Sequence, residues 1–356
     1  MSSIPILRPS YSYDELDRVR AAIRSHWWGM GPLCERFERA FAERHGRRYC
    51  VTVNSATAGL HLATLVSGIG PGDQVIVPAL TFASTALAVL YCGAEPVFAD
   101  VRPDTLTLDW RDVDRLRTGR TVAAIPVDYA GHPAGPGPGG LALIQDASHA
   151  AGGAVYGDLV VYSFHPVKPL ATGDGGAILT DDPDLADRLR RLRWCGIDRS
   201  TFERASGRSY SWDYDIPEMG FKYHWNDLQA AVGLGQLARL DEMAARRRAI
   251  ADRYRAGLQG VELPVDHPDH IYHLFPIRVR AAIRDRLIDE LAAAGIAAGV
   301  HYKPLTHFRL FSGTATPPVT EREWRRLVSL PIYPDLTDRE VDRITATVNQ
   351  FIGAIS

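Results

Sequence analysis

The 356-residue sequence predicts an α/β protein whose mostly parallel sheet is covered by helices on both faces. Between residues 49 and 180, short apolar strand segments alternate regularly with helical segments. The strand segments are rich in Val, Ile, Leu and Ala, which is typical of strands that are buried on both faces. The length favours two domains, and we place a large one at residues 1–239 and a smaller α/β domain at residues 240–356.

The first two elements are predicted helices. Ser12 can cap a helix that runs to Arg24. Apolar residues at four-residue spacing predict a second helix from about Leu33 to His45. The Gly- and Pro-containing residues between the two helices form a predicted turn.

Seven strands are predicted in the sheet region, with helices between them. We expect the strands at residues 49–53, 74–77, 95–99, 121–127, 141–146, 159–164 and 177–180. We expect helices at residues 57–66, 83–91 and 109–117, and a compressed connection rich in Gly and Pro at residues 131–140. Seven short strands would make a full-sized open sheet.

Beyond residue 182 the pattern changes. A basic helix is predicted at residues 184–193, followed by an aromatic and charged stretch without a clear period at residues 194–220. A connection of that length usually has a functional or interface role. One long helix or a kinked pair follows at residues 226–258. The alternation then resumes with a strand at residues 272–279, a helix at 283–294, the segment 296–302 and a final helix from Asp338.

The composition excludes several classes of protein. Lys and Arg number 40 and Asp and Glu number 42, so the net charge of −2 gives no basic footprint for nucleic acid or an anionic membrane. The four cysteines lie far apart and form no C-x-x-C pair, which argues against a disulfide scaffold and favours a reducing cytoplasm. The first residues contain no apolar stretch typical of a signal peptide.

Two other possibilities are also disfavoured. Residues 74–94 carry no formal charge and are long enough to span a bilayer, but Pro78 and several hydroxyl groups interrupt them. We therefore expect a buried strand and a buried helix there. No metal site is indicated, because His301 and His307 are six residues apart and no acidic residue completes a familiar zinc spacing.

Two reactive side chains follow predicted strands, where ligands bind in open α/β folds. Lys168 lies just past a strand and before a Gly-rich turn; a desolvated lysine can form a Schiff base, although a solvated loop lysine is the alternative. Asp146 ends another strand and could pair with a protonated pyridine nitrogen, or cap a helix. His149, three residues later, could equally be a core histidine.

Three further features lie at comparable positions. Residues 54–58 place hydroxyl groups and free backbone N–H groups at a helix start, which suits a phosphate but also an ordinary helix cap. Phe82 could stack on a flat cofactor or lie in the core. Lys222 and His224 could lie near an anionic cofactor or on a solvated loop.

In this order and spacing, the features resemble the DegT/StrS-type sugar aminotransferases, and the resemblance covers nearly the whole chain. The motifs that carry it are residues 28–42 (WGMGPLCERFERAFA), 68–82 (GIGPGDQVIVPALTF), 93–101 (GAEPVFADV), 163–176 (SFHPVKPLATGDGG), 301–307 (HYKPLTH) and 329–334 (SLPIYP). The resemblance implies the pyridoxal-phosphate-dependent transferase fold type I. In that fold, a large domain with a mostly parallel mixed sheet precedes a smaller C-terminal α/β domain.

The resemblance also implies roles for individual residues. Lys168 would form the Schiff base with pyridoxal 5′-phosphate and move the proton, and Asp146 would pair with the ring nitrogen. The other implied cofactor contacts are Ala56, Thr57, Ser163, Phe82, His149 and Lys222, and the implied substrate contacts are His307, Tyr302 and His224.

The chain departs from the family pattern at four positions, the mildest being Ala56, where the family often has Gly. Lys222 stands where the family often has an Asn that reaches across a dimer to the partner's phosphate. His224 stands where Arg is common, and Asp128 where His is common. A lysine at position 222 could bind that phosphate as a point charge instead.

The resemblance implies an aminotransferase that works in two half-reactions. The donor would be glutamate or glutamine, and the acceptor a keto-sugar, most commonly a nucleotide-linked 4-keto-6-deoxyhexose. A 3-keto sugar or a keto-cyclitol is the alternative acceptor. The enzyme is expected to be a cytoplasmic homodimer with shared active sites.

Three rival functions are less well supported. A dehydratase on the same fold has His in place of the Schiff-base lysine, whereas this chain has Lys168. A non-catalytic regulator would not need all the cofactor-binding side chains. An NAD-dependent enzyme would need a G-x-G-x-x-G sequence after the first strand, and none is present.

Overall fold

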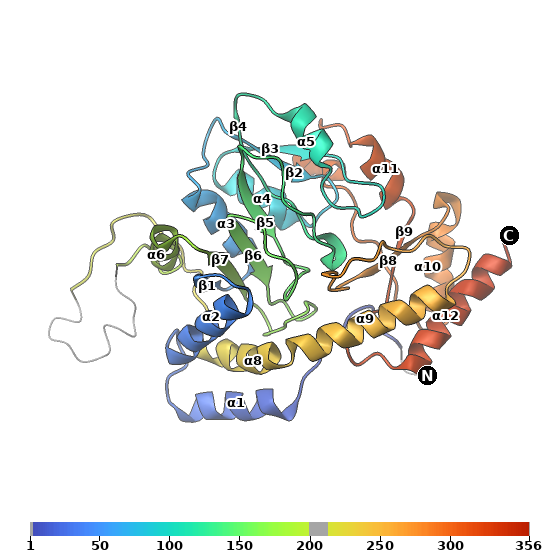
Figure 1. The fold of residues 1–356 in the computed structure, drawn as a ribbon, viewed down its shortest axis with the longest axis horizontal. Coiled ribbons are helices and arrows are strands. Elements are labelled where there is room, and N and C mark those ends of the chain that lie inside the picture. Colours follow the sequence, from blue (N-terminus) through green and yellow to red (C-terminus); the bar gives the residue numbers. More distant parts are fainter. Residues whose placement is uncertain (1–2, 199–212, 356) are drawn as a thin grey trace.

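The computed structural model describes residues 3–198 and 213–355 and centres on a seven-stranded sheet (Figure 1). The strand order is β1-β7-β6-β5-β4-β2-β3, and only the two pairings of β7 are antiparallel. The prediction of a mostly parallel sheet is therefore confirmed. The strands are β1 (Tyr49–Val53), β2 (Gln74–Pro78), β3 (Glu95–Ala99), β4 (Thr121–Ala124), β5 (Ala142–Asp146), β6 (Leu159–Ser163) and β7 (Gly176–Thr180).

Helices cover both faces of this sheet, because successive strand side chains point to opposite faces. In β2, Val75 and Val77 are buried on one face and Ile76 on the other. The first face packs against α3 (Ala56–Val66), α4 (Ala83–Tyr91) and α6 (Pro183–Leu192). The second face packs against α2 (Pro32–Arg44), α5 (Trp110–Leu116) and α8 (Asp227–Ala238), and α1 (Tyr13–Arg24) lies along α8 (Figure 1).

A second cluster of buried side chains forms around a two-stranded antiparallel sheet of β8 (Phe275–Arg278) and β9 (Leu327–Leu330). Its helices are α9 (Leu240–Gly257), α10 (Arg284–Ala293) and α12 (Asp338–Gly353), while α11 (Pro318–Trp324) lies beside the end of the large sheet. Ile4, from the start of the chain, is buried in this C-terminal cluster. The division at residue 239 remains a prediction.

The C-terminal part differs most from the sequence-based expectations. The strand expected at residues 272–279 is shorter in the structure, where it is β8. Residues 296–302 form no continuous strand and make isolated pairings at Ile296 and Gly299. Neither α11 nor β9 was predicted. α11 contacts Asp100 and β9 pairs with β8, and both partners are far away in the sequence, so no local pattern indicates these elements. Four short 3₁₀ helices complete the fold, η1 (Tyr129–Gly131), η2 (Ala281–Ile283), η3 (Leu305–His307) and η4 (Arg309–Phe311).

The remaining expectations on organisation are largely confirmed. Ser12 caps α1 through a capping box, and residues 226–258 form a pair of helices that meets at Arg239. Residues 74–94 form β2 and α4, and none of the described helices is long and apolar enough to cross a membrane. Of the stretch 194–220, residues 199–212 lie outside the described residues.

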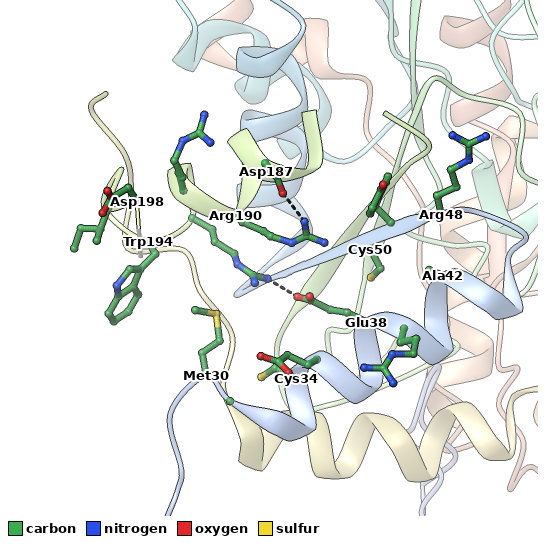
Figure 2. A pocket seen from close by; sticks show the side chains of 17 residues that line it. Met30, Cys34, Glu38, Ala42, Arg48, Cys50, Asp187, Arg190, Trp194 and Asp198 are labelled. Carbon is green, nitrogen blue, oxygen red and sulfur yellow. Dashed lines mark hydrogen bonds and ion pairs between the residues drawn. The ribbon is translucent and has the colours of Figure 1, made fainter. Parts of the chain in front are cut away.

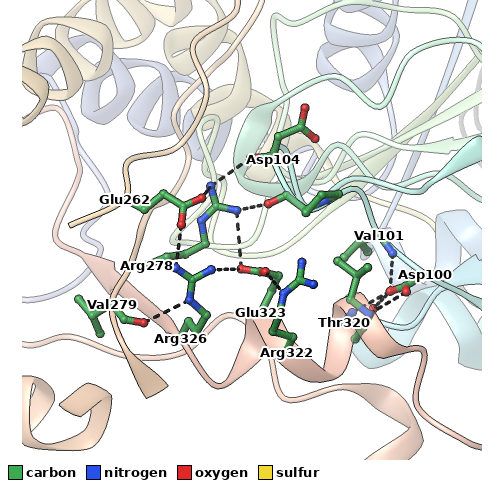
Figure 3. A network of polar contacts seen from close by, with 12 residues as sticks. Asp100, Val101, Asp104, Glu262, Arg278, Val279, Thr320, Arg322, Glu323 and Arg326 are labelled. Atoms are coloured by element: carbon green, nitrogen blue, oxygen red, sulfur yellow. Dashed lines mark hydrogen bonds and ion pairs between the residues drawn. The ribbon is translucent and has the colours of Figure 1, made fainter. Parts of the chain in front are cut away.

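A buried polar network joins the large sheet to the C-terminal part (Figure 3). The carboxylate of Asp100, just past β3, accepts hydrogen bonds from the backbone N–H groups of Val319 (2.8 Å) and Thr320 (2.7 Å), and from the Thr320 hydroxyl (2.8 Å). Arg278, in β8, forms an ion pair with Glu262 (2.6 Å) and donates to the Pro103 carbonyl. Because most of these groups are buried, the network fixes how α11 and β8 sit against the sheet.

Candidate active site

A cavity of about 270 Å³ lies where the parallel strands of the large sheet end. It collects side chains from the starts of α3 and α4, the ends of β5 and β6, and the segment just before η3. The predicted site residues that line it are Ala56, Thr57, Phe82, Asp146, His149, Ser163, Lys168 and Tyr302. The sequence order therefore brings these positions together in space.

The start of α3 forms an anion cradle at one end of the cavity. Ser55 caps the helix by accepting a hydrogen bond from the Ala58 N–H at 3.1 Å. The N–H groups of Ala56 and Thr57 lie in the first turn, where the helix itself offers no acceptor. The Thr57 and Ser84 hydroxyls lie 2.6 Å apart, which joins the starts of α3 and α4. A Cβ at Gly176 would lie 2.8 Å from the Ala56 nitrogen, so only glycine allows this close approach. The cradle suits a phosphate.

Asp146 is the last residue of β5 and lines the cavity. It is buried, its Oδ2 accepts a hydrogen bond from Thr85 at 2.9 Å, and its Oδ1 accepts one from the Ser148 N–H at 3.2 Å. Thr85 donates its hydroxyl proton to Asp146, so its oxygen can only accept from the Thr81 hydroxyl. The two threonine oxygens lie 2.9 Å apart. This chain fixes the orientation of the carboxylate.

Lys168 lies on the turn after β6 and lines the same cavity. Loss of solvation lowers the pKa of its ammonium group to about 8, and the charge of Asp146 opposes this effect. A substantial fraction of this amine is therefore neutral near physiological pH. A neutral amine is the form that acts as a nucleophile or a general base.

The remaining walls are aromatic and polar. Ser163, at the end of β6, faces the cavity near the cradle, and Phe82 is 60% exposed with its ring centroid 6.1 Å from that of Tyr302. His149 is buried, and burial together with Lys168 and His301 lowers its pKa well below the usual value. Burial and the charge of Lys168 likewise lower the pKa of His301 to about 4. Neutral histidines and a tyrosine therefore line part of the cavity.

Sequence analysis missed several lining or supporting residues. Thr85 supports Asp146, and His273 and His301 line the cavity. Thr85 lies in the first turn of α4, four residues after Thr81, and a threonine at this spacing is only a weak signal in the sequence. Nothing near His273 in the sequence distinguishes it from a core histidine.

A comparison with family models identifies the chain. The model of the DegT/DnrJ/EryC1/StrS aminotransferase family matches residues 9–349. The chain belongs to this family.

Solved structures agree with this result. TlmJ, an aminotransferase from Streptoalloteichus hindustanus, is 31% identical over 100% of both chains, with a TM-score of 0.91. DesV from S. venezuelae is 34% identical over 99% of each chain, with a TM-score of 0.88. Spr1654 from Streptococcus pneumoniae, described as a sugar aminotransferase and solved in a PLP form, is 28% identical over 99% of this chain and 100% of that one, with a TM-score of 0.91. This DegT-family protein is a pyridoxal-phosphate-dependent sugar aminotransferase.

The cavity of this DegT-family enzyme fits pyridoxal phosphate. Among the described residues, the buried Asp146 carboxylate forms no ion pair within 4.0 Å, so it is available to a protonated ring nitrogen. The amine of Lys168 suits the aldehyde, and the start of α3 with Ser163 suits the phosphate. The ring of Phe82 offers an aromatic surface beside them.

Three predicted residues of this DegT-family enzyme lie outside the cavity of their own chain. The Lys222 ammonium lies 3.3 Å from the centroid of the Trp194 ring, and the His224 ring meets the same indole edge-on at 4.3 Å. Burial and the charges of Lys222 and Arg193 lower the pKa of His224 to about 4. His307 bonds Glu321 at 2.8 Å instead of facing the cavity.

A larger cavity of about 690 Å³ lies between α2 and α6 (Figure 2). None of the predicted site residues lines it. A buried ion pair between Glu38 and Arg193 (2.5 Å) forms part of its wall, and the Thr52 carbonyl also accepts from Arg193 at 2.8 Å. Lys168 and Asp146 both line the smaller cavity, so we place the chemistry there.

Proposed function

We propose that this enzyme transfers the amino group of glutamate or glutamine to a nucleotide-linked 4-keto-6-deoxyhexose. The observation that carries the proposal is the single cavity in which the Lys168 amine, the oriented Asp146 carboxylate and the cradle at α3 meet. The neutral His and Tyr side chains of the cavity support an acceptor whose sugar ring is uncharged and rich in hydroxyl groups. A 3-keto sugar or a keto-cyclitol would meet the same side chains.

When bound, pyridoxal phosphate supplies a protonated ring that withdraws electrons from the substrate carbon that loses its proton. The chain supplies the groups that control this chemistry. Lys168, with its lowered pKa, accepts the proton from that carbon as a base and returns a proton as an acid. Asp146, fixed by Thr85 and Ser148, keeps its negative charge at one position and so needs no reorientation during the reaction.

The rival functions on this fold have weaker support. A dehydratase of this kind would lack the lysine, and Lys168 faces the cavity. A non-catalytic regulator would have no use for the Thr81–Thr85–Asp146 chain, which holds a buried carboxylate in one orientation. Both rivals predict that glutamate leaves the bound cofactor unchanged.

We also propose a cytoplasmic homodimer in which each subunit completes its partner's site. Lys168 is the only Lys or Arg that lines the cavity among the described residues, whereas a phosphate and a donor carboxylate both need cations. Lys222 lies outside the cavity of its own chain and is the cation that we assign to the partner's site, with His224 beside it as a neutral side chain. All four cysteines are free thiols, which suits a reducing compartment.

The test is the visible absorption of the purified enzyme loaded with pyridoxal phosphate. Glutamate or glutamine should bleach the band of the lysine-linked cofactor, and a nucleotide-linked 4-keto-6-deoxyhexose should restore it as an amino-sugar appears by mass spectrometry. Restoration only by a 3-keto sugar or keto-cyclitol would replace the proposed acceptor. A band that no amino donor bleaches would contradict amino transfer itself.

A further inference from the structure

Both ring nitrogens of His149 have partners, and one of them fixes the tautomer. The backbone N–H of Ala130 points at Nδ1 at 3.2 Å, and Nε2 lies 3.1 Å from the hydroxyl oxygen of Tyr302. A backbone N–H can only donate, so Nδ1 carries no proton. The lowered pKa keeps the ring neutral, and its proton is therefore on Nε2.

The direction of the next hydrogen bond follows from this tautomer. Nε2–H donates to the Tyr302 oxygen, so the phenol must direct its own proton elsewhere. Tyr302 lines the cavity with Lys168, and its hydroxyl has no other hydrogen bond among the described residues. Burial and the charge of Asp146 raise the pKa of Tyr302, so the phenol keeps its proton. The result is a neutral donor that faces the cavity.

The hydrogen bonds from Ala130 to His149 and from His149 to Tyr302 form a relay. The backbone at its start is held by several contacts. Ala130 adopts the left-handed conformation with a φ of 59°, which turns its N–H toward His149. The buried carboxylate of Asp128 accepts hydrogen bonds from Gln145 (2.7 Å) and from the Ala134 N–H (3.0 Å), which closes the turn around residue 130. The Tyr129 hydroxyl donates to the carbonyl of His301, the residue before Tyr302. One turn thus positions both ends of the relay.

We propose that His149 is a positioning residue that makes the Tyr302 phenol a hydrogen-bond donor to an oxygen atom of the keto-sugar acceptor. The inference rests on the proposed function and deepens it. Both ring nitrogens of His149 already have partners, so neither is free for the direct cofactor contact that the resemblance implied. The ring of Tyr302 lies 6.1 Å from the exposed ring of Phe82, and both line the cavity, so its hydroxyl can meet a molecule bound there. A neutral donor suits an uncharged carbonyl or hydroxyl oxygen.

The tautomer can be measured without turnover. Long-range ¹H–¹⁵N spectra of the pyridoxal-phosphate-loaded enzyme, with the His149 signal assigned by its loss in His149→Gln, should show an unprotonated Nδ1 and a protonated Nε2. A proton on Nδ1 would overturn the relay. This measurement does not depend on which sugar is the substrate.

Variants then test the donor, with a dTDP-linked 4-keto-6-deoxyhexose as the probe. Tyr302→Phe should bind pyridoxal phosphate and react with glutamate as the parent enzyme does, but raise KM for the probe about tenfold, the effect of one lost neutral hydrogen bond. His149→Leu should give the same change, and adding it to Tyr302→Phe should cost nothing more. His149→Gln, which can accept from Ala130 and donate to Tyr302, should recover most of the loss.

Matched controls separate the alternatives. Tyr254→Phe removes a buried phenol that donates to the Pro331 carbonyl in the C-terminal cluster, away from the cavity, and it should leave KM for the probe within about twofold. If Tyr302→Phe changes the absorption of the bound cofactor or its pH dependence, the phenol donates to a cofactor oxygen and the proposal is wrong. If the parent enzyme does not aminate the probe at all, the proposed acceptor is wrong. The measured tautomer of His149 still tests the relay in that case.

Discussion

The hydroxyl of Thr85 donates a hydrogen bond of 2.9 Å to Oδ2 of Asp146, and both groups are buried. This contact links the first turn of α4 to the end of β5. A buried carboxylate needs such donors, because each unpaired oxygen would carry a desolvation penalty. The pairing also leaves the carboxylate in one orientation, as its expected role toward the ring nitrogen requires.

Thr85→Val therefore tests the support of Asp146. Valine keeps the shape of the side chain but removes the donor, and we expect a loss of kcat of about tenfold, corresponding to about 1.4 kcal/mol. Steady-state kinetics with a saturating donor would measure it. Thr64→Val is the matched control, because that buried hydroxyl bonds only the Leu60 carbonyl within α3. Equal losses in the two variants would show that Thr85 acts on stability alone.

Lys168→Ala should retain the fold and lose turnover. Removing the amine leaves Asp146 and the cradle in place, so the variant should still bind pyridoxal phosphate, but without the visible band of the lysine-linked form. Circular dichroism and absorption spectra measure the two properties together. Turnover equal to the parent enzyme would contradict the role of Lys168.

The rate at which the cofactor-free enzyme captures pyridoxal phosphate should depend on the protonation of Lys168. Burial lowers its pKa to about 8 from 10.5, so the neutral, reactive amine accumulates as pH rises through 8. We expect the rate to increase from pH 6.5 and level off above pH 9, as followed by stopped-flow absorption. A rate that keeps rising in parallel with free lysine up to pH 10.5 would show that the site does not desolvate this amine.

Asp100→Ala should destabilise the junction between the large sheet and the C-terminal part. Three hydrogen bonds to the start of α11 are lost and buried N–H groups remain unpaired, so we expect a loss of about 2–3 kcal/mol in the free energy of unfolding. Urea denaturation measures this. Asp109→Ala removes the cap of α5, a single bond to the Arg111 N–H, and should cost about 1 kcal/mol. A smaller loss for Asp100 than for Asp109 would contradict the bridging role (Figure 3).

Mixing two inactive variants tests the shared active site. Lys222→Ala should be inactive at a low concentration of pyridoxal phosphate, because the partner's phosphate loses a cation and the homodimer binds the cofactor weakly. When it is unfolded and refolded together with Lys168→Ala, half of the dimers should contain both variants and one complete site. Amino transfer should then reappear in the mixture. No recovery in a mixture shown to contain mixed dimers would place Lys222 outside the partner's site.

The sequence by itself determined the alternation of strands and helices in residues 49–180. It did so because buried parallel strands need continuous apolar runs and each connection needs its own helix. It also determined that Lys168 and Asp146 face one cavity, since both directly follow parallel strands, and such strands end at one edge of a sheet. The family pattern in the motifs added the cofactor and the reaction class.

The tertiary structure alone decided how the site is held together. The tautomer of His149 depends on the N–H of Ala130 and the hydroxyl of Tyr302, which is 153 positions away along the chain. The indole of Trp194 holds Lys222, and residues near 300 meet Ile4 and Ser329 instead of forming a predicted strand. Hydropathy and spacing describe a segment's own preferences, whereas these contacts form between segments that only the folded chain brings within hydrogen-bond distance.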